Sequence, residues 1–108
     1  MKPEVLLTHD ALRDLLDIHA WIAGRDGPAR AGHVFERLER AIESLAESPG
    51  RGAWPKELEA LGIREYRQVH FKPYRVIYRV VGKRVFVVLV ADGRRDMQTL
   101  LSRRLLGA

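Results

Sequence analysis

The stretch that most constrains the fold runs from Tyr66 to Asp96, because it holds two strongly β-forming segments joined by a tight turn. In residues 74–81, YRVIYRVV, one set of tyrosine and valine side chains alternates with a second set that includes two arginines. This period of two is typical of a strand with two different faces. Gly82-Lys83 follows, and glycine supplies the positive φ that a two-residue hairpin needs. Residues 85–90 are apolar throughout, which predicts a central strand covered on both faces.

The segments before this hairpin predict a short strand and two helices. Residues 5–7 form the strand, and Thr8 or Asp10 can cap the helix that follows. The sequence GRDG at residues 24–27 ends this helix, and Pro28 fits the first turn of the next one. The second helix ends at residues 48–50, and the two helices are expected to pack as a hairpin onto one face of the sheet. Their apolar positions are Leu12, Leu15, Leu16, Ile18, His19, Trp21 and Ile22, then Ala31, Val34, Phe35, Leu38, Ile42 and Leu45.

The rest of the chain predicts a connector, two more elements and an α+β fold. Residues 49–63 are rich in glycine, proline and charge, with a helical turn expected over 56–61 and with Trp54 and Leu58 packed against the body. Residues 64–71 form a second strand, and Asp96 caps a short C-terminal helix. The expected order is β-α-α-β-β-β-α in a single domain, residues 1–108, with a mostly antiparallel sheet. The sheet face away from the helical hairpin is expected to expose arginines.

Charge is distributed unevenly along the chain. Residues 1–63 carry 8 Lys/Arg and 11 Asp/Glu, a net of −3, whereas residues 64–108 carry 11 and 3, a net of +8. A positive C-terminal half suits a polyanion or an acidic protein partner. There is no cysteine, which excludes disulfides and thiolate chemistry. No apolar run reaches the length of a signal peptide core or a membrane span, so the expected location is the cytoplasm, without membrane partners.

Several segments in order resemble the RelE/ParE superfamily of toxins from bacterial type II toxin–antitoxin modules. They are LTHDALRDLLDIHAWI, AIESLAESPGRG, GIREYRQVHFKPYRVIYRV and VFVVLVADGRRD followed by LLSRRL. The resemblance covers essentially the whole chain. It implies the fold described above, a role in stabilising a plasmid or chromosome, and a cognate antitoxin that wraps and inactivates the toxin. The superfamily contains ribosome-dependent messenger-RNA endonucleases, which are RelE-like, and inhibitors of DNA gyrase, which are ParE-like.

The RelE-like alternative requires groups that hold a phosphate and groups that move protons. By resemblance, Arg67, Arg75 and Arg95 match cationic positions of those enzymes. A further lysine position of the family falls at Val69 or His70, and His70 could serve as a general base. The position of the family's C-terminal tyrosine falls at Leu101, which has no proton to offer, and no tyrosine or histidine follows Tyr78. The phosphate-binding half of that apparatus is therefore present and the acid–base half is damaged. If the chain is a ribonuclease, it is a metal-independent one acting on messenger RNA at the ribosome.

The ParE-like alternative fits the sequence better. The tail GRRDMQTLLSRRL resembles the ParE pattern, and it makes Arg94, Arg95, Arg103 and Arg104 candidates for contact with gyrase or nucleic acid. Activity would then rest on binding, with no catalytic residue and no cofactor. No two histidines or carboxylates show metal-ligand spacing, so no metal is expected. A third alternative is an inactive remnant or a plain protein-binding module.

The positive half of the chain predicts an antitoxin with an acidic segment, part helix and part extended strand. The residues expected to bind it are Arg67, Arg75, Arg79, Trp21 and Phe35.

Overall fold

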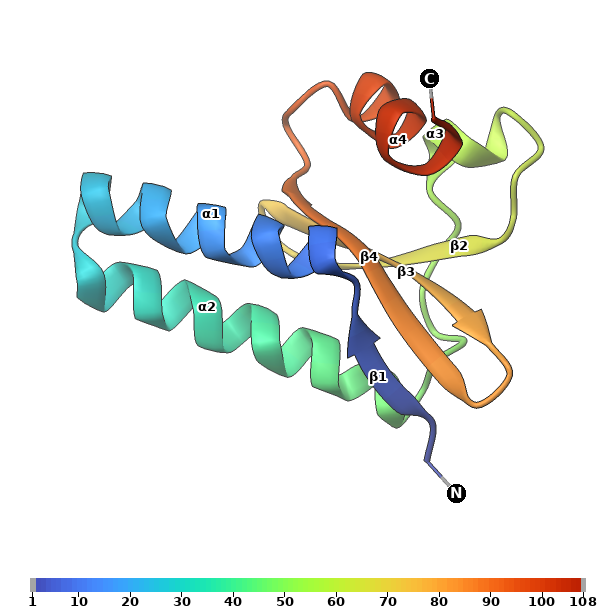
Figure 1. The fold of residues 1–108 in the computed structure, drawn as a ribbon, viewed down its shortest axis with the longest axis horizontal. Coiled ribbons are helices and arrows are strands. Elements are labelled where there is room, and N and C mark those ends of the chain that lie inside the picture. Colours follow the sequence, from blue (N-terminus) through green and yellow to red (C-terminus); the bar gives the residue numbers. More distant parts are fainter. Residues whose placement is uncertain (1, 108) are drawn as a thin grey trace.

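The computed structural model describes residues 2–107, which form four strands and four α-helices around one sheet (Figure 1). The elements are β1 (Glu4–Leu7), α1 (His9–Asp26), α2 (Pro28–Glu43), a 3₁₀ turn (Ser44–Ala46), α3 (Lys56–Glu59), β2 (Tyr66–Phe71), β3 (Tyr74–Val81), β4 (Arg84–Asp92) and α4 (Met97–Leu106). The order of elements agrees with the expected one, and the helical turn expected in the connector is present as α3; the 3₁₀ turn that follows α2 was not expected.

The strands lie in the order β1-β4-β3-β2, so β4 is internal, as its apolar run predicts. β2, β3 and β4 pair antiparallel, and β1 pairs parallel with β4. The register shifts within the β3–β4 pair: Ile77 lies opposite Leu89, but Tyr78 lies opposite Val87, which leaves Val88 as an extra residue. Such a bulge reverses the alternation of side chains along the strand. Val87 therefore packs towards one face of the sheet and Leu89 towards the other.

The helical pair α1 and α2 covers the first face of the sheet (Figure 1). The Thr8 hydroxyl caps α1 by accepting a hydrogen bond from the Ala11 N–H, at 3.1 Å. α1 continues through residues 24–26 and ends at Gly27, whose φ of 94° suits glycine. Leu12 and Leu16 lie outside the core, 42% and 55% exposed, against expectation. The helical pair and the first face of the sheet enclose one apolar core. Its buried residues are Ala11, Leu15, Ile22, Ala31, Val34, Leu38, Ile42, Leu45, Val69, Tyr74, Val76, Tyr78, Val85, Val87 and Val90.

The second face of the sheet is also covered, and the prediction of an open arginine face is wrong there. α3 and α4 lie together in Figure 1, away from the helical pair, and they bury Ile77 and Leu89. Leu58 from α3 and Leu101 from α4 are each 1% exposed in this second core. A helix of 4 residues and one of 10 can cover a sheet face because both present their few apolar side chains to it.

The connector before β2 is held to the sheet by Tyr78. The buried hydroxyl of Tyr78 accepts a hydrogen bond from the Gly52 N–H at 3.0 Å and donates one to the Pro49 carbonyl at 2.7 Å. A Cβ on residue 52 would lie 2.5 Å from that hydroxyl, so glycine is required for this close approach. Ala53 then bridges to Gln68 on the edge strand β2. Within residues 2–107, no helix is both long and apolar enough to cross a membrane.

Candidate functional site

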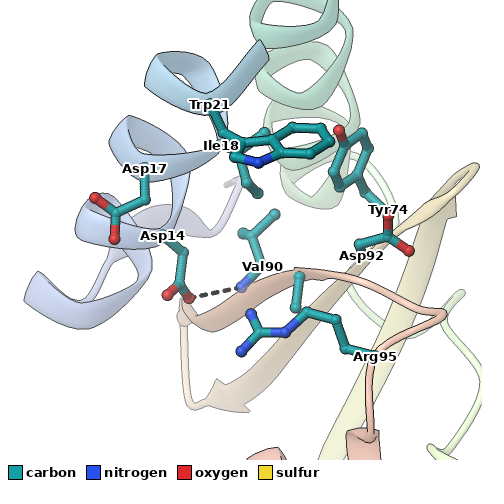
Figure 2. A pocket seen from close by; sticks show the side chains of 9 residues that line it. Asp14, Asp17, Ile18, Trp21, Tyr74, Val90, Asp92 and Arg95 are labelled. Carbon is teal, nitrogen blue, oxygen red and sulfur yellow. Dashed lines mark hydrogen bonds between the residues drawn. The ribbon is translucent and has the colours of Figure 1, made fainter. Parts of the chain in front are cut away.

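An open cleft of about 390 Å³ lies between α1 and the ends of β3 and β4 that are furthest from their hairpin turn (Figure 2). Side chains of Ile18 and Val90 supply apolar surface in its middle. The volume lies at the lower end of the range for ligand pockets. Aromatic and charged side chains surround this apolar surface: Asp14, Asp17, Trp21, Tyr74, Asp92 and Arg95, with Ala91 completing the lining.

Two aromatic side chains form one side of the cleft (Figure 2). Trp21 is 60% exposed, and the Arg25 guanidinium lies 4.9 Å from the centre of its ring. Residues 17, 21 and 25 follow one another at intervals of one helical turn, so their side chains share a side of α1. Tyr74 is 8% exposed, and burial, with the nearby Asp92 carboxylate, raises the pKa of its hydroxyl. Tyr74 therefore stays protonated and can donate a hydrogen bond into the cleft.

Asp14 joins three elements at the edge of the cleft. Its Oδ2 accepts a hydrogen bond from the Val90 N–H at 2.9 Å. Val90 lies in the part of β4 that extends past its last residue paired with β1, Val87. Both carboxylate oxygens also accept from the Arg104 guanidinium, at 2.9 and 2.8 Å. Arg104 donates in addition to the carbonyl of Val88, the bulge residue, at 3.1 Å. This ion pair therefore ties α4 to α1 and satisfies backbone groups around the bulge.

A second carboxylate of the cleft is also neutralised locally. Asp92 accepts three hydrogen bonds from the Arg94 side chain, between 2.6 and 3.2 Å. These bonds lower the pKa of Asp92 below its usual range. In contrast, Asp17 and Arg95 are both exposed and have no ionic partner within residues 2–107. The cleft thus presents two uncompensated charges of opposite sign.

Arg75 lies on the second face of the sheet, where it is 7% exposed. Its two terminal nitrogens each donate to one oxygen of Glu57, both at 2.8 Å, and its Nε donates to the Gln68 side chain at 2.7 Å. Hydrogen bonds from Arg75 lower the pKa of Glu57. A bidentate pair is the strongest form of contact between an arginine and a carboxylate. With the bond to Gln68, each of the three guanidinium nitrogens of Arg75 donates one hydrogen bond. A Cβ on residue 93 would lie 2.8 Å from the Arg75 Cδ, so Gly93 permits this packing.

A second pocket, of about 360 Å³, opens beside Arg75. His70 and Lys56 contribute to it, and His70 pairs with Arg75 across β2 and β3. Trp54 lines the same pocket, and the guanidinium groups of Arg64 and Arg67 lie 4.6 and 5.4 Å from the centre of its ring. Among residues 2–107, no group of three or more His, Asp or Glu side chains is placed to hold a metal ion.

Comparison with known proteins identifies the family. The family described as "ParE toxin of type II toxin-antitoxin system, parDE" matches residues 5–97. The chain belongs to this family. It is therefore a ParE-family toxin of a type II toxin–antitoxin system, within the RelE/ParE superfamily that the sequence resembles. A search of curated proteins finds no significant match.

Solved structures share the fold of this ParE-family toxin. A chain of the chromosomal ParDE toxin–antitoxin system from P. aeruginosa superposes with a TM-score of 0.71 at 18% identity, over 84% of this chain and 96% of that one. The Mycobacterium tuberculosis RelBE2 toxin–antitoxin complex gives 0.60 at 19%, over 85% and 99%. A mutant of the E. coli toxin RelE in the free state gives 0.59 at 16%, over 93% of each chain. These similarities confirm the predicted α+β fold.

The residues predicted to bind an antitoxin do not form one surface in the ParE-family toxin. Arg67 and Arg79 lie on opposite faces of the sheet, since Arg67 pairs with Tyr78, the neighbour of Arg79. Arg67 donates to the Gly52 carbonyl at 2.8 Å, and Arg79 is half exposed, 3.9 Å from Glu65. Phe35 is half-buried on α2.

The predicted tail arginines also differ from one another. Arg94 and Arg104 are engaged by aspartates, whereas Arg95 lines the cleft and Arg103 is exposed on α4 without an ionic partner in residues 2–107. Sequence reasoning missed Asp14 and Glu57, because nothing in the pattern of a helix or a connector reveals its partner in a distant element.

Proposed function

We propose that this ParE-family toxin acts by binding DNA gyrase, and that a cognate antitoxin keeps it inactive. The observation that carries the proposal is the state of Arg75. This arginine matches a cationic position of the RelE-like ribonucleases by resemblance, but here its guanidinium is buried and bound by Glu57 and Gln68. The guanidinium that would have to hold a scissile phosphate is therefore already paired with a carboxylate of the same chain.

The acid–base side of RNA cleavage lacks support as well. Attack by a 2′-hydroxyl needs a group that removes a proton and another that protonates the leaving oxygen. Leu101, at the position of the family's tyrosine, is an apolar residue of α4 that is 1% exposed and packs into the second core. These features favour a toxin that acts through contact rather than bond cleavage.

The contact proposed for the target includes fewer residues than the four tail arginines that the sequence predicts. Arg94 and Arg104 are committed to Asp92 and Asp14, so their charges are already compensated. Arg95 and Arg103 keep uncompensated charges within the described chain, and we assign the contact with gyrase or its DNA to these two. Rim charges of this kind act mainly on association rate and specificity.

A gyrase assay tests the proposal. Purified toxin is expected to inhibit supercoiling or to trap cleaved DNA, and the antitoxin encoded beside it is expected to relieve the effect. Arg95→Ala should abolish toxicity with the fold intact, whereas Lys83→Ala, a matched loss of charge at the distant hairpin turn, should not. Full toxicity of the Arg95 variant would show that this side chain has no functional contact.

The second candidate function is that of a RelE-like ribonuclease. The observation that favours it is the second pocket, in which His70 and Lys56 line the same space as Arg75. Cleavage of messenger RNA on programmed ribosomes, lost in His70→Gln, combined with no effect on gyrase, would establish it instead. Absence of toxicity on expression without antitoxin would favour a remnant or a plain binding module.

An antitoxin partner is supported by the solved relatives, two of which come from toxin–antitoxin systems. We propose a cytoplasmic complex in which an acidic segment approaches the positive half of the chain. Since Arg75 is buried, Arg67 and Arg79 remain as the exposed or half-exposed members of the predicted set on the sheet.

A further inference from the structure

Two residues that the sequence assigns to different partners line the same cleft. Trp21 is a predicted antitoxin contact on α1, and Arg95 is a predicted target contact that follows β4. They are far apart in the sequence, but Figure 2 shows both side chains around the apolar surface of Ile18 and Val90. The tertiary structure thus joins two predicted surfaces into one site.

The cleft has the composition of an anchor site for a protein side chain. Tryptophan and arginine are enriched among the residues that dominate binding energy in protein interfaces. Trp21 presents most of its surface to solvent, which is costly for so large an apolar group unless a partner covers it. Tyr74 is immobilised by burial, so a ligand that enters the cleft meets preformed aromatic surface.

The charges around the cleft indicate what that ligand carries. Asp14 and Asp92 are compensated by their own arginines, so they serve as fixed parts of the rim. Arg95 remains available for a carboxylate, and Asp17 remains available for a cation. A peptide segment with one large apolar side chain and a neighbouring acidic residue satisfies the apolar centre and Arg95 together. A small ion would leave the apolar surface uncovered.

We propose that the cleft is the anchor pocket for the antitoxin. A leucine, phenylalanine or tryptophan of the antitoxin packs on Ile18 and Val90 beside Trp21, and an acidic residue of the same segment pairs with Arg95. This inference rests on the proposed pairing of the toxin with an antitoxin. It also adds a mechanism: because the anchor segment covers Arg95, antitoxin and target compete for one site.

The test is a titration of the toxin with the antitoxin encoded by the adjacent gene, followed by titration with peptides tiled along the antitoxin sequence. A Trp54→Phe background leaves Trp21 as the sole tryptophan of the toxin. With tryptophan-free peptides, its emission should shift to shorter wavelength for the anchor peptide and for no other. Calorimetry should show that Trp21→Ala weakens antitoxin binding about 30-fold, the equivalent of about 2 kcal/mol. Arg95→Ala should weaken it about 10-fold, with reduced salt dependence.

Two matched controls separate the cleft from general surface effects. Leu16→Ala removes an apolar side chain that is 55% exposed on the same helix, and Lys83→Ala removes an exposed cation. Both should bind the antitoxin within about 2-fold of the unmodified toxin. Circular dichroism confirms that each variant is folded.

The possible results distinguish the two levels of the proposal. If Trp21→Ala and Arg95→Ala bind as tightly as the unmodified toxin, the cleft assignment is wrong while the toxin–antitoxin pairing stands. If the unmodified toxin does not bind the antitoxin, the pairing and the cleft assignment fail together. A stable complex of gyrase with antitoxin-saturated toxin would overturn the competition.

Discussion

The ion pair between Arg75 and Glu57 yields the sharpest prediction about stability. Their side chains are 8% and 12% exposed, and the contact is bidentate. Removing one partner of a buried pair costs about 3–5 kcal/mol, because the other charge stays buried without compensation. Glu57→Gln retains one hydrogen-bond acceptor, so we expect about 3 kcal/mol. For 108 residues, the entropy of unfolding is about 0.23 kcal/mol per degree, so the melting temperature should fall by about 13 °C.

Urea denaturation followed by circular dichroism measures this cost, and a double-mutant cycle isolates the pair. Glu57→Gln, Arg75→Gln and the double variant should show a coupling energy of about 2 kcal/mol, since removing both charges leaves neither one isolated. The matched control is Glu59→Gln on the same short helix. Its exposed contact with Arg64, at 3.5 Å, should contribute less than about 1 kcal/mol. Additive effects within about 0.5 kcal/mol would refute the account of Arg75 as a neutralised buried cation.

The same pair predicts a pH dependence. Arg75 lowers the pKa of Glu57 in the folded state below its reference value of 4.5. The resulting stability is fully present above pH 4.5 and is lost as the pH falls through the lowered folded pKa. Unfolding free energies measured between pH 6 and pH 2 should therefore fall more steeply in the unmodified protein than in Glu57→Gln. Parallel curves would show that Glu57 contributes nothing to acid sensitivity.

Three further substitutions test the contacts that place the elements. Tyr78→Phe should destabilise the fold by about 1–3 kcal/mol in urea titrations, because the buried Gly52 N–H loses its acceptor; an unchanged midpoint would contradict this. Arg104→Lys should lower the melting temperature and loosen α4 in hydrogen exchange, since an ammonium cannot reproduce the bidentate contact with Asp14; equal protection in both proteins would be the opposing result. Thr8→Ala should cost about 1 kcal/mol through loss of the α1 cap, and Thr8→Ser should restore it.

Most of the fold could be predicted because local patterns carry it. The alternation in residues 74–81, the positive φ at Gly82 and the helical spacing within α2 each depend on the chain's own backbone geometry. The predicted site was less complete. The sequence predicts Arg95 and Trp21 as contacts for two different partners, and it gives no sign of the carboxylates that neutralise Arg75 and Arg104.

The sequence by itself determined the elements, the strand order along the chain and the excess of positive charge after residue 63. Only the tertiary structure decided which arginines keep that charge available. Glu57 lies 18 residues from Arg75 in the sequence, and Asp14 lies 90 residues from Arg104. No periodic pattern in the sequence encodes such contacts. The bulge at Val88 was equally hidden, because a strand of unbroken apolar residues shows no change of phase. A cleft between α1 and β4 exists only once α1 packs on the sheet, so the set of residues that line it depends on tertiary packing rather than on local sequence.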